Sequence, residues 1–366
     1  MVLELRFASH IQHAIHKYFI WIVLLSYISA AIFPDPGIAL RRIDLGTIHA
    51  GSSNVSLNIP SALLALLLFN AGLGTQAREL KNLTRHPALL AGGILVNVLG
   101  PLVFVIAVSM LGRGWHNPNE IQQILTGLAL IAAMPIAGAS TAWSQNANGN
   151  LALSLGLILA TTLLSPLTTP AVLHSVGFIT TGDYAEDLHE LASDGAGTFL
   201  SVWVILPSAL GILSHLLLGE KQIYIVGPYI KLLNSAILII LNYGNAAISL
   251  PRFVAQPDLD FLLLILVIVG SLCFAMFSCG YFLTSIFRAD KGSVASMMFG
   301  LGMNNNGAGL VLASLSLVDH PEVMLPIIVY NLIQHLFASI SDNALSQNKG
   351  LLGRRHEEPI GSKKRN

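Results

Sequence analysis

The chain alternates between long apolar stretches and short polar connections. A helix that crosses a membrane needs about 20 predominantly apolar residues, and ten stretches approach that length. The sequence therefore predicts an all-α integral membrane protein with ten transmembrane helices. The predicted spans are Tyr18–Phe33, Leu57–Gly74, His86–Leu111, Gln122–Asn146, Leu151–Val176, Gly197–Gly219, Pro228–Leu250, Phe261–Phe287, Gly292–Val318 and Glu322–Asn343.

The ninth span is interrupted near its middle by Asn304, Asn305 and Asn306, with glycines on both sides. An amide moved into an apolar medium without partners costs roughly 2–7 kcal/mol, so these amides are expected to face protein, water or a ligand. Irregular backbone at membrane depth is tolerated where it lines a cavity. The alternative is a polar contact between helices that pack through small residues.

The fourth span carries a second interruption, at Pro135 and Gly138. Proline removes a backbone donor and clashes with the preceding turn. The fourth of five spans and the ninth of ten are corresponding positions in two halves of opposite orientation. The sequence therefore predicts a 5+5 inverted repeat with broken helices 4 and 9, which is the arrangement in which transporters place a binding site.

The charges orient this layout. With both termini cytoplasmic, fifteen of the 19 Lys and Arg residues fall on the inner side, as the positive-inside rule requires. This predicts a multi-pass protein of the cell (inner) membrane. The predicted parts are a cytoplasmic leader (1–17), a first five-helix repeat (18–176), an acidic external loop that can form a short surface helix (177–196), a second repeat (197–345) and a disordered basic cytoplasmic tail (346–366).

Composition excludes several classes of function. The chain is 54% hydrophobic and 10% charged with zero net charge, which offers no basic face for nucleic acid. Cys273 and Cys279 lie in one apolar run, so neither a disulfide framework nor a metal centre is indicated. No charged residue falls deep in a predicted span, which argues against a proton pump. No base and nucleophile pair indicates an enzyme.

The two breaks suggest what binds there. Each break starts a new half-helix whose free N–H groups attract anions, while freed carbonyls and side-chain oxygens suit Na⁺. No other cofactor is expected. A membrane threonine is often bonded to its own helix instead. The candidate residues are Asn97, Ser140, Thr141, Thr161, Thr162, Asn304, Asn305 and Asn306, and among them Ser140, Thr141, Thr161 and Asn304 are candidates for Na⁺. Gln334 of the tenth span is expected to bond across helices.

Four segments resemble the bile acid:sodium symporter family. Pro135–Thr141 is similar to its fourth-span break, Thr161–Pro170 to its fifth span and Leu325–Asn331 to its tenth span. Gly300–Gly307 is similar to its ninth-span signature Glu-x-Gly-Met-Gln-Asn-x-Gly. The resemblance covers nearly the whole chain.

This resemblance implies a panel domain of spans 1, 2, 6 and 7 and a core domain of the other spans. It also implies that spans 4 and 9 cross in the core, with two Na⁺ sites behind the crossing. It places the family's Ser-Asn pair at Ser140 and Thr141, its Gln-Asn pair at Asn304 and Asn305, its fifth-span hydroxyls near Thr161 and Thr162, and its third-span glutamine near Asn97. Gly300 stands where the family has a glutamate that serves both sodium sites.

These observations predict a secondary active transporter for a small organic anion, coupled to Na⁺ and working by alternating access in a lipid bilayer. A sodium-independent facilitator is one alternative. A membrane sensor or scaffold that keeps the fold without transport is another. The sequence makes no prediction of oligomeric state.

Overall fold

A computed structural model describes residues 18–50, 53–75 and 87–353. The predicted leader 1–17 lies outside the described residues, as do residues 354–366 of the predicted tail. The tail prediction begins too early, because the last helix continues to Gly353. Polar residues after Asn343 are compatible with a helix that continues beyond the apolar stretch.

A helix, or two consecutive helices, lies over each predicted span. These helices are α2 (Phe19–Ile32), α4 (Ile59–Leu73), α6 (Pro87–Leu111), α7 (Pro118–Ala133) with α8 (Ala139–Asn146), α9 (Leu151–Gly177), α11 (Ala196–Leu200) with α12 (Leu206–Leu218), α13 (Glu220–Ala255), α14 (Leu259–Ile286), α15 (Lys291–Gly302) with α16 (Asn306–Ser316), and α17 (Met324–Gly353). Short helical turns at 112–114 and 321–323 precede α7 and α17, respectively.

Six helical stretches in the described part of the chain are long and apolar enough to cross a membrane. A seventh is added if α2 and α3 (Asp35–Arg42), which meet at 90°, count as one bent span. α4 and α16 are apolar but shorter. The chain is therefore a multi-pass membrane protein built almost entirely of helices.

One feature departs from the predicted all-α class. Strands β1 (Asp44–Ala50) and β2 (Ser53–Asn58) form an antiparallel hairpin in which Thr47 pairs with Ser56. The sequence pattern missed it because the hairpin lies in the polar connection between the first two spans. It ends at Asn58, which caps α4 by a reciprocal pair of hydrogen bonds with Ser61.

The acidic segment between the two halves is helical. α10 (Asp183–Glu190) is followed by wider π-type turns at 191–195 and 201–205 on either side of α11. Tyr184 and Leu188 are buried, so α10 lies against the protein with its acidic residues around that apolar face. The predicted surface helix in this segment is confirmed.

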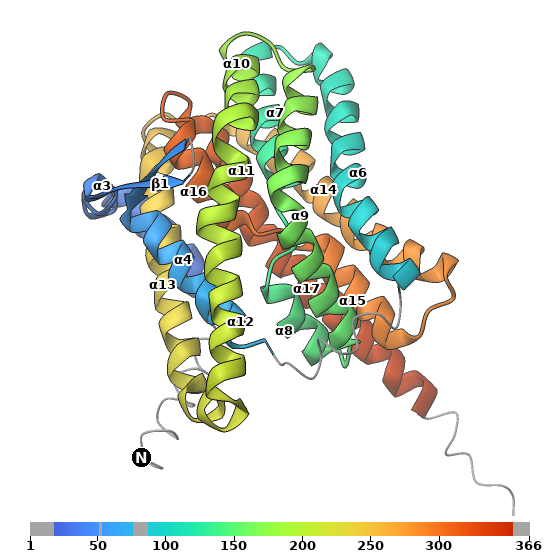
Figure 1. The fold of residues 1–366 in the computed structure, drawn as a ribbon. Coiled ribbons are helices and arrows are strands. Elements are labelled where there is room, and N and C mark those ends of the chain that lie inside the picture. Colours follow the sequence, from blue (N-terminus) through green and yellow to red (C-terminus); the bar gives the residue numbers. More distant parts are fainter. Residues whose placement is uncertain (1–17, 51–52, 76–86, 354–366) are drawn as a thin grey trace, which may run out of the picture.

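The contacts divide most helices into two groups. α13 contacts α2, α4 and α12, and α4 contacts α12, whereas α6, α7, α8, α9, α14, α15 and α17 form a second network. In Figure 1, α4, α12 and α13 lie to the left, and α6, α9 and α14 to the right. Contacts of α13 with α16 and α17 join the groups.

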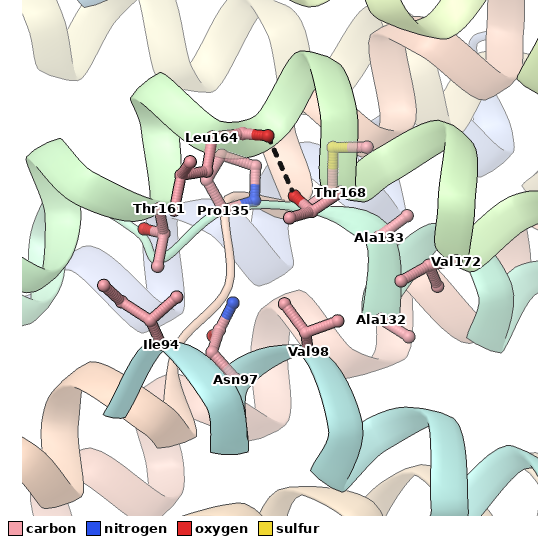
Figure 2. A pocket seen from close by; sticks show the side chains of 11 residues that line it. Ile94, Asn97, Val98, Ala132, Ala133, Pro135, Thr161, Leu164, Thr168 and Val172 are labelled. Carbon is pink, nitrogen blue, oxygen red and sulfur yellow. Dashed lines mark hydrogen bonds between the residues drawn. The ribbon is translucent and has the colours of Figure 1, made fainter. Parts of the chain in front are cut away.

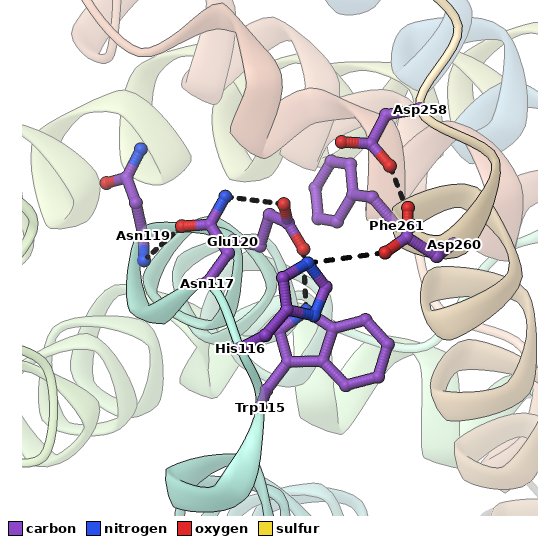
Figure 3. A network of polar contacts seen from close by, with 8 residues as sticks. All are labelled: Trp115, His116, Asn117, Asn119, Glu120, Asp258, Asp260 and Phe261. Atoms are coloured by element: carbon purple, nitrogen blue, oxygen red, sulfur yellow. Dashed lines mark hydrogen bonds and ion pairs between the residues drawn. The ribbon is translucent and has the colours of Figure 1, made fainter.

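The connection from α6 to α7 is fixed by a buried acid (Figure 3). Glu120 is 5% exposed and accepts hydrogen bonds from Trp115 Nε1 at 2.6 Å and Asn117 Nδ2 at 2.5 Å. His116 lies 3.3 Å from Asp260 at the start of α14. The acid also lies in the first turn of α7, where a negative charge is favoured by the helix dipole.

α4 and α12 touch through their backbones. A Cβ atom added at Gly211 would lie 2.0 Å from the carbonyl oxygen of Phe69, and one at Gly72 would lie 2.2 Å from that of Ser208. Only glycine permits this approach, which is a common device for packing helices in membranes.

We expect Gly211→Ala to push α4 and α12 apart and to lower the stability by about 1–3 kcal/mol, the usual cost of overpacking. Thermal unfolding in detergent measures this loss. Gly270→Ala in α14 is the matched control, because a Cβ there meets no atom within 4 Å. Equal melting temperatures for the two variants would contradict the close backbone contact.

Candidate functional site

The two interrupted spans meet at their breaks. α7 ends at Ala133 before Pro135, and α15 ends at Gly302 before the asparagines. Ile136 and Asn304 form an isolated antiparallel bridge. Ala137 N donates to Met303 O at 2.9 Å, and Asn305 N donates to Pro135 O at 2.9 Å. Segments 134–138 and 303–305, here called the paired breaks, thus satisfy each other's backbone groups.

The three asparagines have different surroundings. Asn304 Nδ2 donates to Ile131 O at 2.9 Å, and Asn306 Nδ2 donates to Gln334 Oε1 at 3.0 Å. Asn305 Oδ1 instead accepts from Ala308 N at 3.2 Å and caps α16. Asn304 and Asn306 are 2% and 1% exposed, so both belong to the interior.

Gln334 of α17 supports the break from the side. Its Oε1 accepts from Asn304 N at 3.1 Å as well as from Asn306 Nδ2. The expectation that Gln334 bonds across helices is confirmed. The alternative explanation of the asparagines was a polar contact between helices. Such contacts explain the hydrogen bonds of the side-chain nitrogens of Asn304 and Asn306.

The side-chain oxygens of these two asparagines, in contrast, have no partners. Asn304 Oδ1, Asn306 Oδ1, Asn97 Oδ1 and Ser140 Oγ are buried and have no hydrogen-bond partner. Buried polar atoms are nearly always satisfied, so unpaired ones call for an explanation. Acceptor oxygens without donors are the groups that would coordinate a hard cation.

A small pocket lies beside the break in span 4 (Figure 2). Figure 2 shows Asn97 extending from α6 toward Pro135 and Thr161. The end of α7 lines the same pocket, and its C-terminal carbonyls carry the negative end of the helix dipole. Among the candidates from the sequence, Asn97 and Thr161 are brought together here.

The hydroxyl of Thr161 is already engaged. It lies 2.8 Å from Leu157 O and accepts from Ile136 N at 3.2 Å. Back-bonding to its own helix, the expected alternative for a membrane threonine, is therefore present. The same atom ties α9 to the paired breaks.

The remaining candidates do not line this pocket. Thr141 Oγ1 lies 3.2 Å from Ser154 Oγ on α9. Thr162 is half-buried, and its backbone carbonyl accepts from Ser165 Oγ. Of the Na⁺ candidates Ser140, Thr141, Thr161 and Asn304, only Thr161 lines the pocket.

Apolar side chains surround Gly300. A Cβ added there would meet Leu157 Cδ1 at 3.1 Å and Ile136 Cδ1 at 3.9 Å. The position that the resemblance assigns to a glutamate thus faces methyl groups. Among the described residues, no group of three His, Cys, Asp or Glu side chains gathers to hold a metal ion.

Sequence reasoning missed a polar chain that leads away from the breaks. Gln334 Nε2 donates to Asn331 Oδ1 at 3.4 Å, and Asn331 Nδ2 donates to Tyr27 OH at 2.9 Å and to Asn242 Oδ1 at 3.3 Å. The chain connects α17 with α2 and α13. An amide side chain inside an apolar span indicates in the sequence that a polar partner exists, but it does not indicate which residue that partner is.

We expect Gln334→Leu to destabilise the protein, because Asn304 N and Asn306 Nδ2 lose their acceptor. A buried donor without a partner costs about 1–3 kcal/mol. Thermal unfolding measures the effect against Gln256→Leu, which changes an exposed glutamine after α13. If both variants melt like the unmodified protein, Gln334 does not support the break.

Comparisons with known proteins show the family to which the chain belongs. Uncharacterized protein YbaS of Bacillus subtilis (strain 168) is 25% identical over 76% of this chain and 85% of its own length. The uncharacterized sodium-dependent transporter YocS of the same organism is 34% identical over 30% of this chain and 32% of its own. The "Probable sodium/metabolite cotransporter BASS2, chloroplastic" of Oryza sativa subsp. japonica is 23% identical over 68% of this chain and 55% of its own.

The Sodium Bile acid symporter family model matches residues 61–254. The chain belongs to this family and is a membrane transport protein, not an enzyme.

Proposed function

We propose that the protein is a secondary active transporter that moves a small organic anion together with Na⁺ by alternating access. The observation that carries the proposal is the set of unpaired buried oxygens around two breaks that pair with each other. Most buried acceptors in proteins are satisfied, so four unpaired ones around the breaks favour a ligand. Family membership supports the same function.

The anion is assigned to the helix starts that follow the breaks. α8 begins after Gly138, and no side chain caps its first turn. The N-terminal N–H groups of such a helix favour negative charge. α16 begins on the other break and is capped by Asn305. An anion between the two starts would be near both positive dipole ends.

Sodium is assigned to the oxygens on the other side of the breaks. Asn97 lines the pocket at the end of α7, and its Oδ1 is buried without a hydrogen-bond partner. Asn304 Oδ1 is also unpaired, and it belongs to the amide whose Nδ2 donates to Ile131 O of α7. The names of YocS and BASS2 describe sodium dependence and sodium cotransport, respectively. In this chain Na⁺ would meet neutral oxygens.

The proposed architecture is ten spans in two inverted repeats, 18–176 and 197–345, in the cell membrane. The panel consists of α2, α4, α12 and α13, and the core contains the paired breaks. Rocking of one group against the other would expose the anion alternately to each side. Contacts between α13 and the pair α16 and α17 would then change during each cycle.

A sodium-independent facilitator is the second candidate, and Gly300 favours it. A carboxylate at that position would compensate the charge of bound cations, whereas Leu157 and Ile136 cannot. Neutral ligands offset only part of the cost of burying a charge. The two candidates differ in whether a Na⁺ gradient drives accumulation.

Uptake by purified protein in liposomes tests the proposal. We expect accumulation of at least one of four radiolabelled anions, namely pyruvate, succinate, citrate and taurocholate, when Na⁺ is higher outside. Asn97→Ala should raise the Na⁺ concentration for half-maximal uptake severalfold, because an ion ligand is lost. Asn119→Ala, at an exposed asparagine of α7, is the control. Equal uptake with and without Na⁺ would favour the facilitator, and no uptake of any anion would refute transport.

The orientation is tested by labelling with an impermeant maleimide in intact cells, after Cys273 and Cys279 are replaced by serine. We expect Glu186→Cys, on the exposed side of α10, to react from outside. We expect His356→Cys to react only after lysis, because the positive-inside rule places that end in the cytoplasm. The reverse pattern would overturn the proposed topology.

A further inference from the structure

Arg41 has an unusual position for a cation in this protein. Every other Lys or Arg side chain whose burial the structure describes is exposed, whereas Arg41 is half-buried. It lies in the last turn of α3, which contacts α13. Arginine stays charged in proteins, so this region carries a permanent positive charge.

The partners of Arg41 are neutral. Nη1 donates to Asn245 Oδ1 of α13 at 2.6 Å, and Nη2 donates to Ser314 O at 3.1 Å. Among the described residues, no carboxylate pairs with it. A guanidinium has five donors and binds carboxylates best in a bidentate geometry. Most of its capacity for an anion is therefore unused.

Two further polar groups lie on α13, one on the carboxamide that Arg41 contacts and one a helical turn beyond it. Asn245 Nδ2 belongs to the same carboxamide that Arg41 contacts, and it has no partner. Ser249, one helical turn away, also has an unpartnered hydroxyl. Both residues are 1% exposed. An unsatisfied amide donor beside a cation that has no carboxylate partner in the described ranges matches an anionic oxygen, and the Ser249 hydroxyl is a further free donor on the same helix.

A polar route connects this cluster to the paired breaks. Asn242 lies three residues before Asn245, so the two side chains are neighbours on one face of α13. Asn242 contacts Asn331, and Asn331 leads through Gln334 to Asn304. An anion leaving Arg41 would meet hydrogen-bonding groups along this path rather than a purely apolar interface.

We propose that Arg41, with Asn245 Nδ2 as second donor, is an anion-binding residue that selects the negatively charged substrate on its way to the paired breaks. The inference rests on the proposed function. In the present conformation Arg41 donates a hydrogen bond to a carbonyl near the C-terminal end of α16. Helix α16 in turn packs against α17. Separation of α13 from α16 frees the guanidinium, and the anion takes the place of Ser314 O.

A purely structural role gives a different expectation. Arginine near the end of a helix stabilises the last carbonyls and the dipole, so Arg41 as a cap for α16 alone would affect stability and not substrate affinity. The two roles are separable, because the Michaelis constant for the anion and the melting temperature are measured independently.

The test uses the full chain in liposomes and whichever of pyruvate, succinate, citrate and taurocholate the unmodified protein takes up fastest. We expect Arg41→Gln to raise the KM for that anion at least tenfold and Arg41→Lys to restore part of the affinity, with the half-saturating Na⁺ concentration unchanged. Arg42→Gln, at the exposed neighbouring arginine, should behave like the unmodified protein.

Asn245→Asp keeps the result interpretable if Arg41→Gln is unstable. It places a carboxylate beside the intact guanidinium, so it should compete with the substrate and raise the KM without lowering the melting temperature. An unchanged KM in Arg41→Gln or Asn245→Asp would overturn this inference and leave the proposed function standing. Absence of uptake by the unmodified protein would instead remove the proposed function, and the inference with it.

Discussion

The pairing of two helix breaks is the constraint on which the rest of the structure depends. In an apolar interior every backbone N–H and C=O needs a partner within the protein, and breaking a helix releases several of them. The segments around Ile136 and Asn304 solve this by bonding to each other. α17 and α9 complete the arrangement through Gln334 and Thr161. Neither break would be stable without the other.

The breaks were predictable because their causes are local. Pro135 and the run from Asn304 to Asn306 disfavour a continuous apolar helix whatever surrounds them. Partners across helices were less predictable, because they depend on the rotation of each helix. Thr161 and Thr162 illustrate this point: adjacent residues point about 100° apart on a helix, and only Thr161 reaches the breaks. The hairpin at 44–58 was missed because polar connections carry no hydrophobic period.

The surroundings of Gly300 separate what the family shares from what this chain does itself. The paired breaks need no acid at that position, since backbone groups and amides hold them. The pairing of the breaks therefore does not depend on a carboxylate at position 300, where Leu157 packs instead. The side chain at position 300 thus bears on the proposed ion binding and not on the pairing of the breaks.

The backbone contact between α4 and α12 has a mechanical consequence. Where Gly72 and Gly211 meet carbonyl groups, no side chain can change rotamer to absorb displacement. A shift of one of these helices against the other would therefore have to move backbone atoms at this contact. The contact between α13 and α17 is of another kind, because Asn242 and Asn331 meet there through side-chain amides, and such groups can exchange hydrogen-bond partners without a change in the backbone.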